Sequence, residues 1–287
     1  MQRFAAILLL ASTGAVVAFG ADWRGTVAEL FKAGQWPQAQ HLLDAVVARE
    51  PGNAEAWARL GETYLNRDQG EPAVPPMEKA VALDPANAGY ERHLGDAYGL
   101  SAQQAGFFSK TGWALKCKAA YVKAVELDPA NVSNRRSLLE FYRQAPGFAG
   151  GGMDLAYGQA TEIRKLDPVA GEIEFGNLYA ADKKFPEALA AFEAALKAKP
   201  DSYAALYQIG RLAALGSAEA ARGLACLRRC LELPVPARQP GFSPVQWRIG
   251  NILERQGDKA GARAAYEAAV KADPKFVQAA DALKNLH

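Results

Sequence analysis

Residues 54–87 read AEAWARLGETYLNRDQGEPAVPPMEKAVALDPAN, and hydrophobic residues recur there every three or four positions. The first series comprises Trp57, Leu60, Gly61 and Tyr64, and the second comprises Ala73, Met77 and Ala80. Such spacings place the side chains of each series on one face of a helix. Gly61 and Ala73 have almost no side chain, so the two helices can approach closely at these positions. The stretch therefore predicts a hairpin of two packed α-helices.

A proline closes this stretch, and prolines recur along the chain at 51, 85, 129, 168, 200, 234 and 274, with spacings of 34, 44, 39, 32, 34 and 40 residues. Pro85 cannot continue a helix and pushes Asp84 away from the α region. Asn53, Asn87 and Asn131 each follow such a proline by two residues, where a side-chain oxygen can cap the next helix. A period near 34 residues is typical of stacked helical hairpins, in which each unit contacts only its neighbours.

The repeated unit resembles the tetratricopeptide repeat, whose pattern W-L-G-Y…A-F-A-P is met by Trp57, Leu60, Gly61, Tyr64, Ala73, Met77, Ala80 and Pro85. Three further copies keep most of this pattern: Leu94, Gly95, Tyr98, Tyr121, Ala124 and Pro129; Gly176, Tyr179, Ala188, Phe192, Ala195 and Pro200; Ile249, Gly250, Leu253, Ala262, Tyr266, Ala269 and Pro274. Two weaker copies have Val27 and Leu139 at the glycine position, and a sixth, irregular copy ends at Pro234. The resemblance implies an all-α, right-handed α-solenoid of about seven hairpins.

The expected repeats span approximately 22–53, 54–87, 88–131, 132–168, 169–202, 203–242 and 243–276. Residues 277–287 are expected to form a final capping helix, because a terminal repeat needs a polar outer surface. One face of that helix would carry Ala279, Ala280, Leu283 and Leu286. Gln278, Asp281 and Asn285 would lie on its solvent face.

The composition indicates a folded protein without an electrostatic nucleic-acid surface, since half of the residues are hydrophobic and the net charge is +2. His41, His93 and His287 are widely separated, which argues against a catalytic cluster. The chain has no metalloprotease, nucleophile-elbow or P-loop pattern. The three glycines at 150–152 lack the Lys-Ser/Thr of a phosphate loop and are expected to form a turn. We therefore expect no enzyme, no cofactor and no metal site.

The three cysteines, Cys117, Cys226 and Cys230, are expected to fill small buried positions of the repeats. The alternative is a metal or redox pair formed by Cys226 and Cys230, which lie one helical turn apart. A metal site needs about four ligands, and no nearby histidine completes one. Packing is the favoured interpretation.

Residues 1–20 differ from the rest of the chain. Arg3 precedes an apolar run, and Ala18-Phe19-Gly20 provides small residues for cleavage, which is typical of a secretory signal peptide. The mature chain would then begin near Ala21 and, in a bacterium, would reside in the periplasm without stable membrane insertion. The alternative is a retained anchor, because the segment from Phe4 to Ala21 has no charge.

Two adjacent repeats are longer than the others. The third gains ten residues within 101–113 and the fourth gains five within 144–154, and both insertions are expected in the turn inside the hairpin. Because the two repeats are adjacent, stacking would place both insertions on one edge of the solenoid. Insertions in repeat proteins often gather on a functional face. The candidate partner-binding edge consists of Phe107, Phe108, Trp113, Phe148 and Met153. The alternative is that these residues pack on each other and stabilise longer turns.

The resemblance implies a second candidate surface, the concave groove, which in the family is lined mainly by the first helix of each repeat. The matching positions hold Arg59, Glu62, Arg92, Asp96, Arg136, Glu140, Arg143, Asn177, Tyr207, Arg211, Trp247, Arg248 and Asn251. Some family members hold a peptide's terminal carboxylate with lysines, asparagines and an arginine. Arg59, Arg92 and Arg136 lie near the basic positions of that set, but its lysines are missing. Glu62, Asp96 and Glu140 lie one turn from arginines, so ion pairs within the chain are an equal alternative.

The sequence thus predicts an exported, non-enzymatic solenoid that binds a protein or an extended peptide as a scaffold or assembly factor of the bacterial envelope. One alternative is a module that binds cell-wall glycan through Trp247, Tyr207 and the arginines. Another is an accessory subunit of an envelope enzyme complex.

Overall fold

The computed structural model describes residues 23–237 and 239–286, so the signal-peptide prediction for residues 1–20 lies outside the described residues. Fifteen α-helices and one 3-10 helix, and no strand, occur in this part of the chain. The first seven helices are α1 (Trp23–Lys32), α2 (Trp36–Arg49), α3 (Ala54–Leu65), α4 (Gly70–Leu83), α5 (Ala88–Gln104), α6 (Phe107–Leu127) and α7 (Val132–Gln144). They are followed by η1 (Gly147–Ala149), α8 (Met153–Leu166), α9 (Pro168–Ala181), α10 (Phe185–Ala198), α11 (Tyr203–Ala214), α12 (Ala220–Glu232), α13 (Phe242–Arg255), α14 (Lys259–Ala272) and α15 (Val277–Asn285). The expected all-helical solenoid is confirmed.

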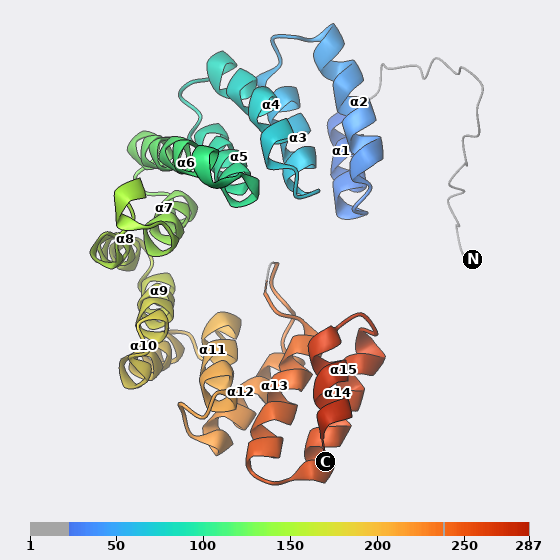
Figure 1. Cartoon of the computed structure of the whole chain (residues 1–287), viewed down its shortest axis with the longest axis vertical. Coiled ribbons are helices and arrows are strands. Elements are labelled where there is room, and N and C mark those ends of the chain that lie inside the picture. Colours follow the sequence, from blue (N-terminus) through green and yellow to red (C-terminus); the bar gives the residue numbers. More distant parts are fainter. Residues whose placement is uncertain (1–22, 238, 287) are drawn as a thin grey trace, which may run out of the picture.

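Successive helices pack as antiparallel pairs that stack into an open arc (Figure 1). From α3 to α11 the odd-numbered helices line the inner side of the arc, and the even-numbered helices form its outer side. Extensive contacts join helices that are at most two places apart in the order. The hydrophobic core is accordingly a series of clusters between neighbouring helices and has no single centre.

The glycines of the repeat allow the close approach that the sequence indicated. A Cβ atom on Gly61 would lie 2.6 Å from Cγ of Met77, and one on Gly95 would lie 2.5 Å from the ring of Tyr121. Both partner side chains are buried. In both of these hairpins, a large side chain of the second helix therefore fills the space that the glycine leaves.

The asparagines before the first helices act as caps, as expected. The Oδ1 atom of Asn53 accepts from the amide of Ala56 at 3.1 Å, and Asn131 accepts from Ser133 at 3.0 Å. Asn87 accepts from Gly89 at 3.1 Å in the same way. The caps satisfy amide groups that have no partner at the start of a helix.

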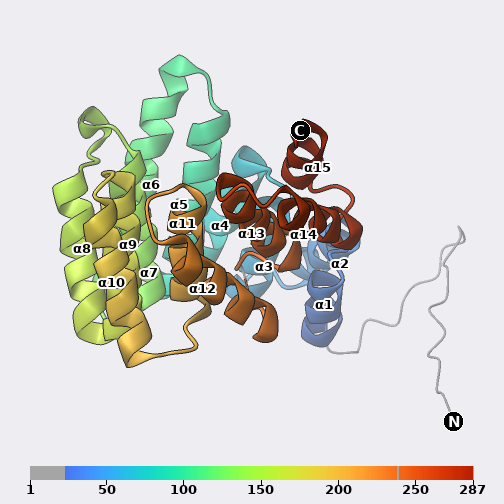
Figure 2. The ribbon, with the colours of Figure 1, turned by 90° about the horizontal axis from the view of Figure 1, so that it is seen from below.

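The insertion in the third repeat does not lengthen the turn, and the prediction for it was wrong. Instead, α5 continues to Gln104 and α6 begins at Phe107, so the added residues extend both helices. Figure 2 shows their paired ends projecting beyond the neighbouring hairpins. The insertion in the fourth repeat does form a turn, which contains η1 and runs to Gly152; Gly150, directly after η1, adopts the left-handed conformation (φ 81°).

The connection between α12 and α13 was not anticipated. Residues 233–241 contain three prolines, and Figure 1 shows this connection, in orange, reaching into the hollow of the arc. We call it the inner loop. The hydroxyl group of Tyr203 donates to the carbonyl group of Pro240 and holds the end of the inner loop. The inner loop is exposed at Pro234, Val235, Pro236 and Ala237.

At the end of the chain, α15 packs against α14, with Ala279 and Leu286 buried. This agrees with the expected capping helix. No described helix combines the length and the apolar character required to cross a lipid bilayer.

Candidate functional site

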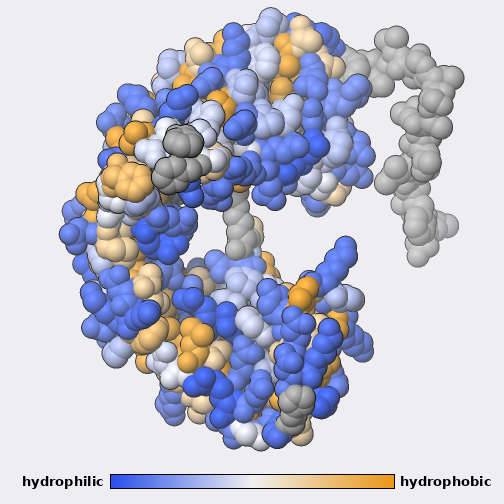
Figure 3. Space-filling view, in the orientation of Figure 1, coloured by the Kyte–Doolittle hydropathy of each residue, from blue (hydrophilic) through white to orange (hydrophobic). Residues whose placement is uncertain are grey.

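The inner side of the arc encloses a pocket of about 1220 Å³. Arg92 and Asp96 of α5, Arg136 and Glu140 of α7, and Asn177 of α9 line it. The inner loop, which connects α12 and α13, contributes Ala237 and Gln239 to the same pocket. Figure 3 shows mainly hydrophilic residues around the hollow. Sequence positions far apart in the chain thus contribute to one concave surface, on which apolar side chains such as Phe141, Phe148 and Ile173 lie beside the polar ones.

A second pocket of about 430 Å³ lies between α7, α9 and α11. Arg143, Asn177, Tyr207 and Arg211 line it, together with Glu140. These are candidate groove residues from the sequence, and the structure brings them together. Tyr207 is only 9% exposed, so its ring packs in the core and offers little surface to a ligand.

Hydrogen bonds join α7, α9 and α11 across the groove. Nε of Arg136 donates to Glu174 at 2.5 Å, and the amide of Gln208 donates to Asn177 at 2.9 Å. Nε of Arg211 in turn donates to Gln208 at 2.7 Å. The amide of Asn177 also donates to Glu174 at 3.5 Å, so the five residues form one network. Glu174 is 6% exposed, and its pairing with Arg136 satisfies a charge that would otherwise be buried alone.

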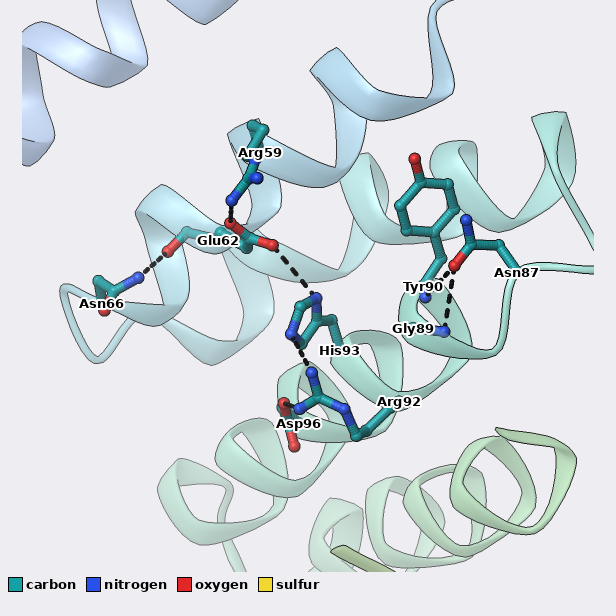
Figure 4. A network of polar contacts seen from close by, with 9 residues as sticks. All are labelled: Arg59, Glu62, Asn66, Asn87, Gly89, Tyr90, Arg92, His93 and Asp96. Atoms are coloured by element: carbon teal, nitrogen blue, oxygen red, sulfur yellow. Dashed lines mark hydrogen bonds and ion pairs between the residues drawn. The ribbon is translucent and has the colours of Figure 1, made fainter. Parts of the chain in front are cut away.

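Another network joins α3 and α5 (Figure 4). Arg59 lies 2.8 Å from a carboxylate oxygen of Glu62, whose other oxygen lies 3.3 Å from Nδ1 of His93. Arg92 contacts Nε2 of His93 at 2.6 Å and pairs with Asp96 at 3.3 Å. Because a guanidinium group can only donate, Nε2 of His93 accepts and Nδ1 carries the proton that faces Glu62.

The sequence left open whether the groove arginines serve a ligand or pair within the chain. In the structure, a carboxylate partner is present for each of four arginines: Arg59, Arg92, Arg136 and Arg143. The hydrogen bonds from Arg143 hold the pKa of Glu140 below its usual value, although burial opposes this effect. Arg59, Arg92 and Arg136, the positions nearest the family's carboxylate-binding set, are therefore neutralised internally.

The last part of the groove is formed by α13. The ring of Trp247 packs edge-on against Phe276 with a centroid distance of 5.8 Å, and the guanidinium of Arg248 lies 4.2 Å above the Trp247 ring. Asn251 accepts a hydrogen bond from the hydroxyl of Tyr266 at 2.9 Å. Trp247 and Asn251 thus have structural contacts of their own, which the sequence did not reveal.

The candidate edge is only partly as predicted. The side chains of Phe107 and Phe108 lie outside the described residues, although both positions belong to α6. Trp113 turns inward and packs against Tyr98 with a centroid distance of 5.8 Å, and Met153 packs against a core cluster. Phe148 is 77% exposed. Trp113 and Met153 therefore do not share an exposed apolar patch with Phe148.

The cysteines are buried free thiols, in agreement with the packing interpretation. Burial raises the pKa of Cys117 and of Cys230 to about 12, which keeps both thiols protonated at neutral pH. Within the described residues, no group of three or more side chains has an arrangement that could hold a metal ion.

Sequence reasoning missed Glu174 and Gln208. Both lie two residues before the glycine of their repeat, as Arg59 does before Gly61, so the rule that selected Arg59 also selects them. It missed the inner loop as well. The signal for that was the unusual length and proline content of the connection before α13.

Comparison with known families decides the identity of the repeat. Models described as tetratricopeptide repeat match residues 30–92, 173–230 and 244–276. The chain belongs to the tetratricopeptide repeat family. Such repeats form scaffolds for interactions between proteins. The open arc of helical hairpins, with the first helices on its inner side, is the fold of this tetratricopeptide repeat protein.

Curated relatives include a PEX5-related protein of Rattus norvegicus, 25% identical over 209 residues that cover 68% of this chain and 33% of the relative. Peroxisome biogenesis protein 5 of Arabidopsis thaliana is 35% identical over 77 residues, which cover 27% of this chain and 11% of the relative. The tetratricopeptide repeat chain thus spans at most about a third of these relatives. Among solved structures, a tetratricopeptide repeat protein from Parabacteroides merdae is similar, with a TM-score of 0.61, 14% identity, and coverage of 91% of this chain and 96% of the other. That likeness shows the fold.

Proposed function

We propose that this tetratricopeptide repeat protein is a non-enzymatic scaffold that binds a protein or an extended peptide in its concave groove. The observation that supports this proposal is the pocket of about 1220 Å³ on the inner side, lined by polar and apolar side chains from α5, α6, α7, α9 and α11 and by the inner loop. Side-chain amides such as that of Asn177 can both donate to and accept from a peptide backbone. The groove is therefore suited to a chain in an extended conformation.

The glycan alternative has less support. A sugar-binding groove relies on aromatic faces against which the sugar stacks, but Tyr207 is packed in the core and one face of Trp247 is covered by Arg248. Four groove arginines are engaged with carboxylates, namely Arg59, Arg92, Arg136 and Arg143. The chemistry left on the surface favours a peptide.

A photo-crosslinking amino acid tests where the partner binds. It replaces Ser137, which lines the large pocket, or Arg228, which is exposed on α12, a helix that does not line this pocket. In the native host we expect a discrete crosslinked protein from position 137 and none from position 228. Equal crosslinking from both positions, or none from 137, would contradict binding in the groove.

We also propose that the protein is exported to the bacterial periplasm and acts in the cell envelope. This rests on the charge and hydrophobicity of residues 1–20. The test is the mass of the protein purified from fractionated cells. A mature chain starting near Ala21 in the periplasmic fraction is expected, whereas a full-length chain in the membrane fraction would indicate a retained anchor.

A further inference from the structure

The paired ends of α5 and α6 project beyond the neighbouring hairpins (Figure 2). We call residues 103–111 the tip. Five of its residues are exposed: Gln103, Gln104, Gly106, Ser109 and Lys110. A Cβ atom added at Gly106 would meet no other atom within 4 Å. The tip is therefore open to contact with a surface that the neighbouring hairpins do not reach.

The outermost part of the tip is apolar and carries no charge. Residues 105–109 read AGFFS, and Phe107 and Phe108 lie in the first turn of α6. Turns between helices at a protein surface are ordinarily polar. Two successive phenylalanines at a projecting turn therefore indicate an apolar contact with something outside the chain.

A further phenylalanine is exposed on the same side of the arc. Phe148, in the turn that contains η1, is 77% exposed. This turn contacts α6, and Figure 2 shows it in light green beside α8, on the side to which the tip projects. Two adjacent hairpins thus present phenylalanine toward the same side.

The apolar positions are followed along α6 by positive charge. Residues 97–125 contain no acidic residue and four lysines: Lys110, Lys116, Lys118 and Lys123. Only Lys123 pairs with a described carboxylate, that of Glu126 at 3.6 Å. Lys116 and Lys118 instead lie near aromatic rings, 4.9 and 5.9 Å from the ring centroids. Positive charge is therefore concentrated here, although the net charge of the whole chain is only +2.

The spacing along α6 places this charge at a suitable depth for a lipid surface. Because a helix rises about 1.5 Å per residue, Lys110, Lys116 and Lys118 follow Phe107 by about 5, 14 and 17 Å. Apolar side chains of interfacial segments enter the headgroup region by about 5–10 Å. Lys110 would then lie among the headgroups, and Lys116 would lie within about one Debye length, roughly 8 Å, of them.

We propose that the tip docks on the surface of a bilayer that contains anionic phospholipids. Phe107 and Phe108 enter the headgroup region, and the lysines of α6 face the lipid phosphates. Apolar residues combined with lysines and without carboxylates are the chemistry that binds such surfaces. This contact is peripheral, goes beyond the proposed binding of a peptide in the groove and does not rest on it.

A polarity-sensitive nitrobenzoxadiazole label on Ser109→Cys reports entry of the tip into lipid. The native cysteines are buried, so the label attaches at the introduced position. The same label on Gly52→Cys is the control, because Gly52 is exposed in a connection between hairpins, at the opposite edge. Both the full-length chain and the chain starting at Ala21 are used, since the apolar run near the N-terminus is itself able to bind vesicles.

The vesicles contain equal parts of phosphatidylglycerol and phosphatidylcholine, or phosphatidylcholine alone. We expect the label at position 109 to shift to the blue with the anionic vesicles and the label at position 52 to stay unchanged. Affinity should be about tenfold higher for anionic vesicles, because each lysine at such a surface strengthens binding roughly fivefold. Salt at half-molar concentration should remove this preference.

The variant Phe107→Ser, Phe108→Ser should bind anionic vesicles at least tenfold more weakly, because it loses the apolar area that enters the lipid. The matched control is Phe242→Ser, Val277→Ser. These two residues are exposed where α13 and α15 begin, after connections between hairpins, and their loss should leave vesicle binding unchanged. Circular dichroism verifies that both variants are folded.

The proposal is overturned if the label at position 109 does not respond to anionic vesicles in either form of the chain. It is also overturned if the Phe107→Ser, Phe108→Ser variant binds as the normal chain does, or if the label at position 52 responds equally. An equal response to soluble polyglutamate, at the same concentration of negative charge, would overturn the lipid surface and indicate an acidic protein as the partner of the tip.

Discussion

Gly70 shows how much one missing side chain contributes at the junction between repeats. A Cβ atom at this position would lie 2.5 Å from the backbone nitrogen of Ser101 in the next repeat. A backbone atom cannot move aside as the flexible side chain of Met77 can beside Gly61. The glycine is therefore required by the contact between α4 and α5.

We expect Gly70→Ala to lower the free energy of unfolding by about 1–3 kcal/mol, which is typical of overpacking. The matched control is Gly112→Ala in α6, where nothing lies within 4 Å of the added Cβ. That variant is expected to gain about 1 kcal/mol, because alanine is a better helix former than glycine. Urea unfolding measures both, and equal effects in the two variants would contradict the role of the close approach.

The buried thiols make stability depend on pH in the alkaline range. Burial raises the pKa of Cys117 and Cys230 from the usual value of 9.0 to about 12. The unfolded chain then loses these protons first, so the stabilisation is complete below about pH 9 and declines as the pH rises toward 12. We expect the free energy of unfolding to fall between pH 8 and 10, by at most about 1.4 kcal/mol per pH unit for each thiol.

The variant Cys117→Ala, Cys230→Ala is the control for this dependence. It should be less stable at pH 8 but show a flatter decline toward pH 10 in urea unfolding. An unchanged slope would mean that other groups cause the decline.

At the scale of the single helix, the sequence rules for caps predicted where helices begin, whereas the repeat length did not predict how long each helix is. Asn131 could be identified as a cap because its position after Pro129 is a feature of the neighbouring sequence. The extension of α5 and α6 was not predicted, although residues 101–105 contain no breaker and Gly106 is the first residue that interrupts the helical pattern. The pairing of Arg136 with Glu174 could not be predicted. The two residues lie 38 positions apart on different helices, and whether they meet depends on the angle at which these helices pack.

The cap of α7 offers a direct test at this scale. We expect Asn131→Ala to lower the free energy of unfolding by about 1 kcal/mol, because the amides of Ser133 and Asn134 lose their acceptor. Asn131→Asp, which keeps an acceptor oxygen, should lose less. Urea denaturation distinguishes the two, and equal losses would argue against the cap.

The projecting ends of α5 and α6 depend on Trp113. Its ring packs against Tyr98, and Lys116 lies 4.9 Å from its centroid. We expect Trp113→Ala to speed amide hydrogen exchange in residues 100–114 while the other hairpins stay protected, because each repeat contacts only its neighbours. Leu115→Ala on the exposed side of the same helix is the control, and faster exchange across the whole chain in the Trp113 variant would contradict a local role.

At the scale of the whole molecule, we expect the inner loop to limit access to the groove. Ala237 and Gln239 line the same pocket as residues of α5 and α7. Deleting residues 235–239 should leave the helices intact, because the described side chains of this stretch contribute nothing to the core clusters. A cysteine introduced as Ser137→Cys should then react faster with a bulky maleimide. The native cysteines are buried and provide the background rate. An unchanged rate would show that the inner loop does not restrict the groove.

The arc has extensive contacts only between helices close in order, and this makes the molecule comparable to a spring. The distance between its two ends is set by the bends at all the junctions between repeats, because none of the extensive helix contacts crosses the hollow. A ligand that tightens one junction by a small angle therefore moves the ends by an amount that grows with the number of repeats beyond it. Because elastic compliance is distributed along the whole arc, binding at one junction changes the distance between α1 and α15.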